Sequence, residues 1–181
     1  MNNAVWLVAV GLVTTAGQVA YATQYLTQAD AQKVIFAEAT EFKPVLISLN
    51  AAQKTAVSSV SKTSTPIPDK TIWQAYAGGK HVGWFVIDEV YGKHEYITYA
   101  VGIDLNGAVR RVEVLEYRET YGGQVRNATW RDQFVGKKNG AKLKLEDDIA
   151  NISGATLSCL HISDGVRRVL ALHEFVLKKI A

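Results

Sequence analysis

Residues 101–117 read VGIDLNGAVRRVEVLEY, two runs rich in β-branched residues on either side of an Asn-Gly pair. The Asn-Gly pair tolerates the positive φ angles of a tight turn, so this stretch predicts an antiparallel hairpin. In the second run Val112 and Val114 alternate with polar residues, and the next position of the pattern is Glu116 or Tyr117. Such alternation is typical of a sheet with one covered face.

Two more runs of strand length lie upstream of this hairpin. β-Branched and aromatic residues are concentrated in four segments, 71–76, 82–90, 96–104 and 109–117, and glycine-containing turns separate them. This order predicts a four-stranded β-meander.

Helical spacing dominates after the meander. Apolar residues recur three and four positions apart from Ile162 to Ile180, which predicts a closing helix of about five turns. Trp130 and Phe134 have the spacing of a short helix that packs its aromatic side chains inward. The predicted fold class is therefore α+β, an antiparallel sheet packed against a long C-terminal helix.

The chain before the meander predicts a helical segment and a linker. Apolar positions from Thr27 to about Asn50 fit helical spacing, with Thr27 or Asp30 as the cap and a kink or break at Pro44. Residues 58–70 are rich in Ser, Thr and Pro and predict a linker or long loop. We expect an N-terminal helical segment over 23–57 and the main domain over 71–181.

The first 22 residues have the pattern of an export signal. Residues 4–13 are an apolar run of ten, too short to span a bilayer, and Ala20-Tyr21-Ala22 has the small-x-small form of a cleavage site. We expect cleavage near Ala22 and a periplasmic or other extracytoplasmic location. A retained membrane anchor and a buried helix are the alternatives.

Composition excludes several classes of site. The net charge is +3 and the basic residues are interspersed with acidic ones, which argues against nucleic acid as a partner. Cys159 is the only cysteine and no CxxC pair occurs, so c-type haem attachment and structural zinc are poor interpretations. No Walker loop, GxSxG or HExxH signature is present, and we predict neither catalytic residues nor metal ligands.

Residues 152–159, ISGATLSC, lie where the closing helix must begin. Unpaired amides of a first helical turn bind a phosphate well, and small residues leave room for one. The candidate ligands of such an anion are Ser153, Gly154, Ala155, Thr156 and Ser158. The alternative is that Thr156 or Ser158 only caps the helix.

ISGATLSC followed by DGVRRVLAL resembles the FMN-binding domain of the flavin-carrying subunits of the sodium-translocating NADH:quinone reductase and the Rnf complexes, and of small exported flavoproteins. The resemblance extends more loosely over 80–177. It implies that Thr156 carries FMN through a phosphoester made by a dedicated flavin transferase. The family usually has an aspartate three residues before the Ser or Thr of its motif, where this chain has Ala150. Covalent and non-covalent binding of FMN therefore both remain open.

Glu119-Thr120 followed by Tyr121-Gly122-Gly123 resembles the family's Glu-Thr and glycine loop, which lies near the flavin. This implies polar contacts from Glu119 and Thr120, and an aromatic wall from Tyr121 or from Trp130. An ordinary core position is the alternative for Trp130.

The resemblance implies an exported flavoprotein that acts in electron transfer, with redox partner proteins in the periplasm or membrane. No residues indicate a substrate pocket, so an electron carrier is favoured over a self-sufficient oxidoreductase. Two alternatives remain: a flavin-free exported binding module of the same fold, and a membrane-anchored subunit of an electron-transfer complex.

Overall fold

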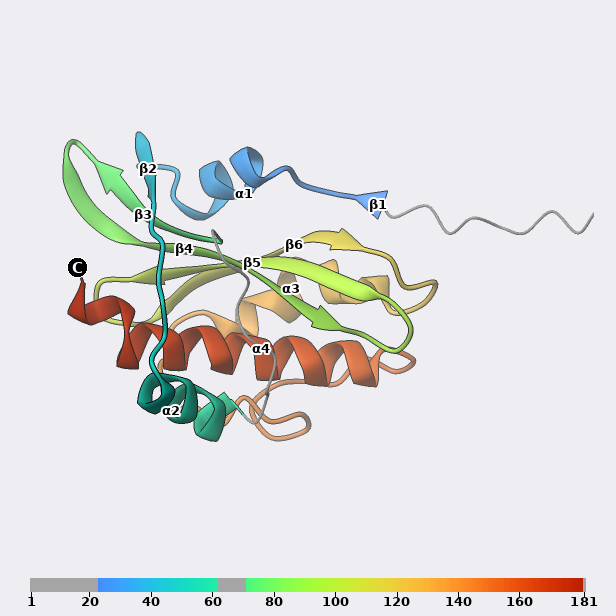
Figure 1. Ribbon diagram of the computed structural model, residues 1–181. Helices are drawn as coiled ribbons and strands as arrows, with labels where there is room; N and C mark the ends of the chain where they lie inside the picture. The colour runs from blue at the N-terminus through green and yellow to red at the C-terminus, as the bar shows by residue number, and fades with distance from the viewer. Residues whose placement is uncertain (1–22, 62–70, 181) are drawn as a thin grey trace, which may run out of the picture.

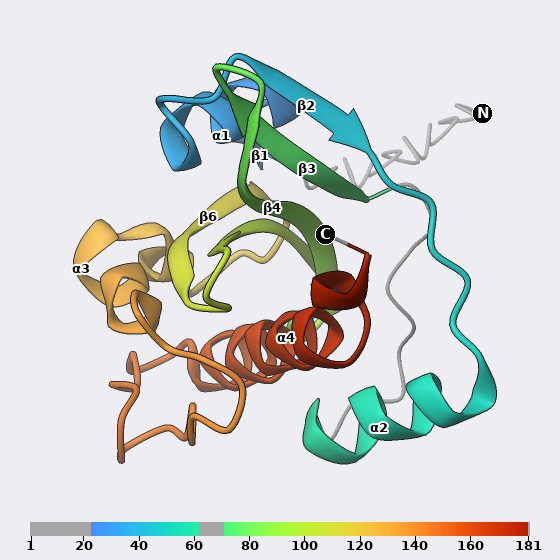
Figure 2. The same ribbon diagram turned by 90° about the vertical axis from the view of Figure 1, so that its left-hand side faces the viewer.

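The structure, a computed structural model, describes residues 23–61 and 71–180. The segment interpreted as an export signal and residues 62–70 of the expected linker lie outside this range. An antiparallel sheet forms the middle layer, with helix α1 (Gln28–Ile35) on one face and helix α4 (Thr156–Phe175) on the other (Figures 1 and 2). The predicted α+β class is confirmed.

The central four strands are the predicted meander. They are β3 (Ile72–Ala77), β4 (Lys80–Tyr91), β5 (Tyr96–Asp104) and β6 (Val109–Tyr117). Thr98 pairs with Glu116 and Tyr99 with Val114, so the register skips one residue of β6. Because of this bulge, Tyr117 is the next residue after Val114 that joins the core beneath α4.

Two short strands from the N-terminal segment complete the sheet at its two edges. Strand β1 (Thr23–Gln24) pairs with β6, and β2 (Glu41–Pro44) pairs with β3. The strand order is β1-β6-β5-β4-β3-β2. Residues on both sides of the expected boundary at 58–70 therefore share one sheet.

The helical interpretation of residues 27–50 is correct only at its start. Thr27 caps α1, and its Oγ1 accepts a hydrogen bond from the Asp30 amide at 3.1 Å. Residues 41–44 are a strand, where Pro44 is tolerated because it ends an edge strand. Helix α2 (Ala51–Ser61) follows, so the expected linker does not begin at residue 58.

Helix α2 packs beside α4, away from the sheet (Figure 2). Asn50 Oδ1 accepts from the Gln53 amide at 2.9 Å, and Gln53 Oε1 accepts from the Asn50 amide at 3.0 Å. This reciprocal capping box starts the helix.

Two glycines of the sheet allow α1 and the residue that follows it to pack closely against the strands. A Cβ on Gly102 would lie 2.1 Å from Ile35 Cγ2, and one on Gly83 would lie 2.7 Å from a ring carbon of Phe36. Any larger side chain at either position would push α1 away.

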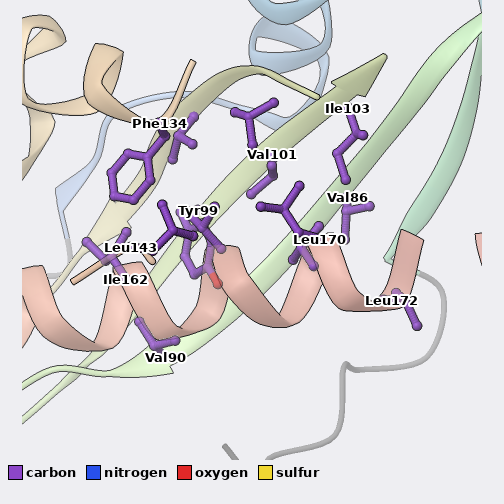
Figure 3. Packing of buried hydrophobic residues seen from close by; sticks show 14 of the residues in the cluster. Val86, Val90, Tyr99, Val101, Ile103, Phe134, Leu143, Ile162, Leu170 and Leu172 are labelled. Atoms are coloured by element: carbon purple, nitrogen blue, oxygen red, sulfur yellow. The ribbon is translucent and has the colours of Figure 1, made fainter. Parts of the chain in front are cut away.

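The main core lies between the sheet and α4, where Val101, Ile103 and Leu170 are fully enclosed (Figure 3). It includes a polar cluster in which Arg168 pairs with Asp88 at 2.7 Å and Tyr99 donates to Asp88 Oδ2 at 2.5 Å. A Cβ on Gly165 would lie 2.0 Å from Tyr99 Oη, so this glycine permits the close approach of α4.

Helix α3 (Ala128–Arg131) and a 3₁₀ turn (Asp132–Phe134) bury Trp130 and Phe134, which confirms the predicted short helix. Helix α4 has 20 residues, which confirms the predicted length of about five turns; it ends at Phe175, and a 3₁₀ turn (Leu177–Lys179) follows where the apolar spacing continues to Ile180. Among residues 23–61 and 71–180, no helix has the length and apolarity that crossing a membrane requires.

Candidate functional site

Three loops meet the first turn of α4 at one end of the molecule. They are the turn between β4 and β5 at 92–95, the loop after β6 at 118–123 and the turn at 151–155 (Figure 1). Contacts between these loops, described below, bring the predicted site residues together.

The first turn of α4 has no side-chain cap. Ala155 occupies the N-cap position, and Thr156 is the first helical residue with an exposed side chain. The alternative that Thr156 or Ser158 caps the helix is therefore wrong. Gly154 has φ +80° and open space where a Cβ would stand, so the entrance to the helix is uncrowded.

The loop after β6 lies directly on this turn. Gly122 has φ +87°, and a Cβ there would come within 2.7 Å of both Ala155 Cβ and Tyr117 Oη. The structure thus brings the glycine loop and the Ser-Gly-Ala-Thr turn into van der Waals contact.

Tyr117 connects the strand, the loop and the helix. Its hydroxyl donates to the Tyr121 carbonyl at 2.5 Å and lies 3.2 Å from Ser158 Oγ. Burial raises the pKa of Tyr117 above its usual value, so the hydroxyl keeps its proton at neutral pH. Ser158 is 4% exposed and faces this hydroxyl rather than solvent.

Glu119 holds the neighbouring hairpin turn. Its Oε1 accepts from the amides of Lys93, of His94 at 2.6 Å and of Glu95 at 3.1 Å. Burial alone would raise the pKa of Glu119, but these amides outweigh it and the pKa lies below its usual value. The carboxylate is ionised at neutral pH, and one of its oxygens is committed to the turn.

The remaining predicted residues lie at different depths. Thr120 is exposed and Tyr121 is 79% exposed, and both directly precede Gly122, which contacts Ala155. Trp130 is 5% exposed, packs edge to face on Phe134, and donates from Nε1 to the Ala150 carbonyl at 2.7 Å. Trp130 is therefore an ordinary core residue, as the alternative interpretation expected. Its hydrogen bond to Ala150 fixes the chain that leads into Ser153.

Cys159 and Asn151 flank the motif inside the protein. Burial raises the pKa of the Cys159 thiol, which is fully enclosed and therefore protonated and unreactive at neutral pH. In the described part of the chain, Asn151 Oδ1 is buried without a hydrogen-bond partner. Such an orphaned acceptor is costly unless another group supplies a donor.

Sequence reasoning missed Tyr117, Asn151 and Gly92. Tyr117 has the pattern of an ordinary sheet residue, and its role depends on a bulge that the spacing does not reveal. A Cβ on Gly92 would lie 2.5 Å from Glu119 Oε1, a contact between residues 27 positions apart that has no local signal.

Residues 92–171 match the family model described as the FMN-binding domain. The crystal structure of Shewanella oneidensis NqrC resembles the fold with a TM-score of 0.52 and 19% sequence identity, over 87% of this chain and 92% of that chain. None of the curated proteins matches the chain.

The residues present fit a flavin phosphate. Thr156 presents an exposed hydroxyl at an uncapped helix start, where the amides and the helix dipole favour an anion. Gly154 leaves the approach open, and the unpaired Asn151 oxygen suits a donor such as a ribityl hydroxyl. Residues 92–171 are therefore similar to the FMN-binding domain family, and this match supports FMN as the cofactor of the domain.

Proposed function

We propose that this protein is an exported electron-transfer flavoprotein that carries FMN on Thr156 through a phosphoester. One observation carries the proposal: within the matched domain, the exposed Thr156 hydroxyl is the first side chain of α4, and no side chain caps that helix. A phosphate diester at this position keeps one negative charge beside the positive end of the helix dipole.

Attachment requires Thr156 to act as a nucleophile. Its hydroxyl oxygen forms the bond to phosphorus and loses its proton, and the leaving group of an activated flavin nucleotide takes the bonding electrons. A flavin transferase supplies the base and holds the donor nucleotide. Ala150 exposes no carboxylate to such an enzyme, but Asp147 is exposed on the same turn and pairs with Lys142 at 3.1 Å.

When bound, FMN supplies one- or two-electron redox chemistry, and the protein supplies binding and electrostatics. Ser153, three residues before Thr156, and Thr120, in the loop that contacts Ala155 through Gly122, are exposed and available to hydrogen-bond the phosphate and ribityl chain. Tyr117 and Gly122 fix the loop that borders this position. Tyr121 and Leu157 are exposed there, so the site is open to a partner protein rather than enclosed around a substrate.

The extracytoplasmic location depends on removal of residues 1–22. Strand β1 begins at Thr23, directly after the expected cleavage position at Ala22. Cleavage there leaves every described element intact. A covalent bond to Thr156 would then keep the cofactor attached where free FMN is scarce.

The decisive experiment is the intact mass, under denaturing conditions, of full-length protein co-expressed with a flavin transferase and exported. We expect a gain equal to FMN less one water, together with loss of the first 22 residues. Thr156→Ala should abolish the gain, whereas Thr129→Ala, an exposed threonine on α3, should retain it. A wild-type protein of unmodified mass that is yellow would contradict the phosphoester, and a colourless one would favour the flavin-free binding module.

A further inference from the structure

Both backbone groups of Ala150 are bound by side chains from α3 and from the 3₁₀ turn that follows it. Trp130 Nε1 donates to the Ala150 carbonyl at 2.7 Å, and Gln133 Oε1 accepts from the Ala150 amide at 2.7 Å. Gln133 Nε2 also donates to the Trp130 carbonyl at 2.9 Å, so one glutamine bridges the helix and the chain that leads to Thr156. We call Trp130, Gln133 and Ala150 the Ala150 clamp.

The Ala150 clamp acts on the backbone and not on a side chain. Ala150 is exposed, and its methyl group offers no hydrogen bond. Asp147, an exposed carboxylate of the preceding turn, is paired with Lys142 at 3.1 Å. The position of the chain at residue 150 therefore depends on the two hydrogen bonds from the α3 side.

The clamp stands on a fixed support. Trp130 is 5% exposed, so its ring is part of the core. The next residue, Arg131, pairs with Glu113 and donates from Nη1 to the Val112 carbonyl at 2.6 Å, which ties α3 to β6. Because α3 cannot shift without breaking these contacts, Ala150 is held in place relative to the sheet.

The other end of the attachment turn is held by different contacts. Ala155 touches Gly122, and its amide donates to the Ile152 carbonyl at 2.9 Å. Residues 153–154, between the two ends, are exposed. The turn that presents Thr156 is thus held at both ends and open in the middle.

Loss of the hold at residue 150 would leave the turn fixed only at its helix end. A single hydrogen bond of this kind changes an opening equilibrium by about five-fold. A turn that samples several arrangements presents Thr156 correctly for only part of the time, and the apparent affinity of an enzyme for it falls by that fraction.

We propose that Gln133 is a positioning residue for flavin attachment, and that it presents Thr156 by holding the backbone of Ala150 to α3. This proposal rests on the proposed attachment at Thr156. Gln133 acts through Ala150 and not on the reacting hydroxyl, so its loss changes how often the turn is correctly placed and leaves the chemistry of the bond unchanged.

The first test is hydrogen exchange in the unmodified full-length protein. Gln133→Met keeps the length of the side chain and removes both of its hydrogen bonds. We expect the Ala155 amide to exchange about five-fold faster than in wild type, although this amide bonds to Ile152 and not to Gln133. The amide of Leu170, in the middle of α4, should exchange at the wild-type rate.

Two further variants complete the exchange test. Trp130→Phe loses the bond to the Ala150 carbonyl but keeps an aromatic ring in the core, and it should also speed exchange at Ala155. Gln124→Met is the matched control, because it replaces an exposed glutamine on the 3₁₀ turn at Gly123–Arg126, and it should exchange as wild type.

The second test is the rate of flavin attachment, followed by mass at several concentrations of the protein with a fixed amount of flavin transferase. Gln133→Met should raise KM by about five-fold and leave kcat unchanged, because only the fraction of correctly placed turns changes. Gln124→Met should keep both constants.

Wild-type exchange at Ala155 in both Gln133→Met and Trp130→Phe would overturn the proposal. Equally fast exchange at Leu170 would also overturn it, since that result indicates a general loss of stability, and so would a fall in kcat at constant KM. If the wild-type protein gains no mass, the proposed attachment fails separately. The exchange at Ala155 then still decides whether Gln133 holds the turn: faster exchange supports that hold, and unchanged exchange refutes it.

Discussion

Gly122 and Ala155 are in direct contact, although they are 33 positions apart in the chain: a Cβ on Gly122 would lie 2.7 Å from the Ala155 Cβ. This contact joins the loop after β6 to the turn that presents Thr156. The geometry of the turn that presents Thr156 therefore depends on a residue that has no side chain.

Gly122→Ala should disturb this contact. At φ +87° an alanine costs about 1–2 kcal/mol in backbone strain, and its methyl group would also collide with Ala155 and Tyr117. We expect a lower urea midpoint and a reduced yield of FMN adduct by mass. Gly123→Ala is the control, because its Cβ would meet only Arg126 at an ordinary 3.5 Å. Equal behaviour of the two variants would refute the role of the contact.

Tyr117→Phe should loosen the loop without opening the core. The variant loses the hydrogen bond to the Tyr121 carbonyl, worth about 1 kcal/mol of unfolding free energy. We expect slower flavin attachment in a time course followed by mass. Tyr76→Phe loses a comparable bond to Gln74 at 3.0 Å on β3 and should attach flavin at the wild-type rate. A wild-type rate for Tyr117→Phe as well would show that the loop needs no such anchor.

Arg168→Met should strongly destabilise the fold. Asp88 is 1% exposed, and removing its partner leaves a buried carboxylate unpaired, which costs about 3–5 kcal/mol. Arg118→Met breaks the more exposed pair with Glu116 and should cost less than about 1 kcal/mol. Chemical denaturation of both variants measures the difference, and similar losses would contradict the buried pair's importance.

Acidification should destabilise the protein through its buried histidine before the carboxylates titrate. Burial lowers the pKa of His173 in the folded protein. Below the ordinary histidine pKa of about 6.5, His173 therefore binds a proton in the unfolded chain while it is still neutral in the folded protein, and this favours unfolding. Stability is therefore complete above about pH 6.5 and falls as the pH drops below it. Urea titrations between pH 5 and 7 should show a flatter profile for His173→Phe than for wild type.

His94→Gln, at an exposed position of the β4–β5 turn, is the control for that series and should keep the wild-type slope. Because the pKa of His81 is also lowered by burial, some slope should persist in His173→Phe. A profile identical to wild type would exclude His173 as the group responsible.

The sequence predicted the meander and the closing helix because their signals are local. Alternation, the Asn-Gly turn and three-and-four spacing each act within a few residues, and strands β5 and β6 have the predicted bounds. The same locality made Ser153 to Thr156 a visible motif, because the residues around the start of a helix are consecutive in the chain.

Errors arose where tertiary contacts decide. Residues 41–44 have helix-compatible spacing, but they form a strand because they pair with the free edge of β3. The capping box at Asn50 and Gln53 is a local signal that would have located α2. In contrast, the sequence predicted Glu119 as a polar contact of the flavin. Only the folded chain shows that its carboxylate accepts a hydrogen bond from the amide of His94, 25 residues earlier.

The placement of β1 and β2 at opposite edges of the sheet governs the order in which this chain can assemble. Both strands precede in the chain the meander that they border, so residues 23–44 can pair only after strands that come much later in the sequence have formed. Until then β3 and β6 each present an unpaired edge, the kind of surface on which β-proteins aggregate. Docking of residues 23–44 onto the finished meander is thus the step that removes both exposed edges.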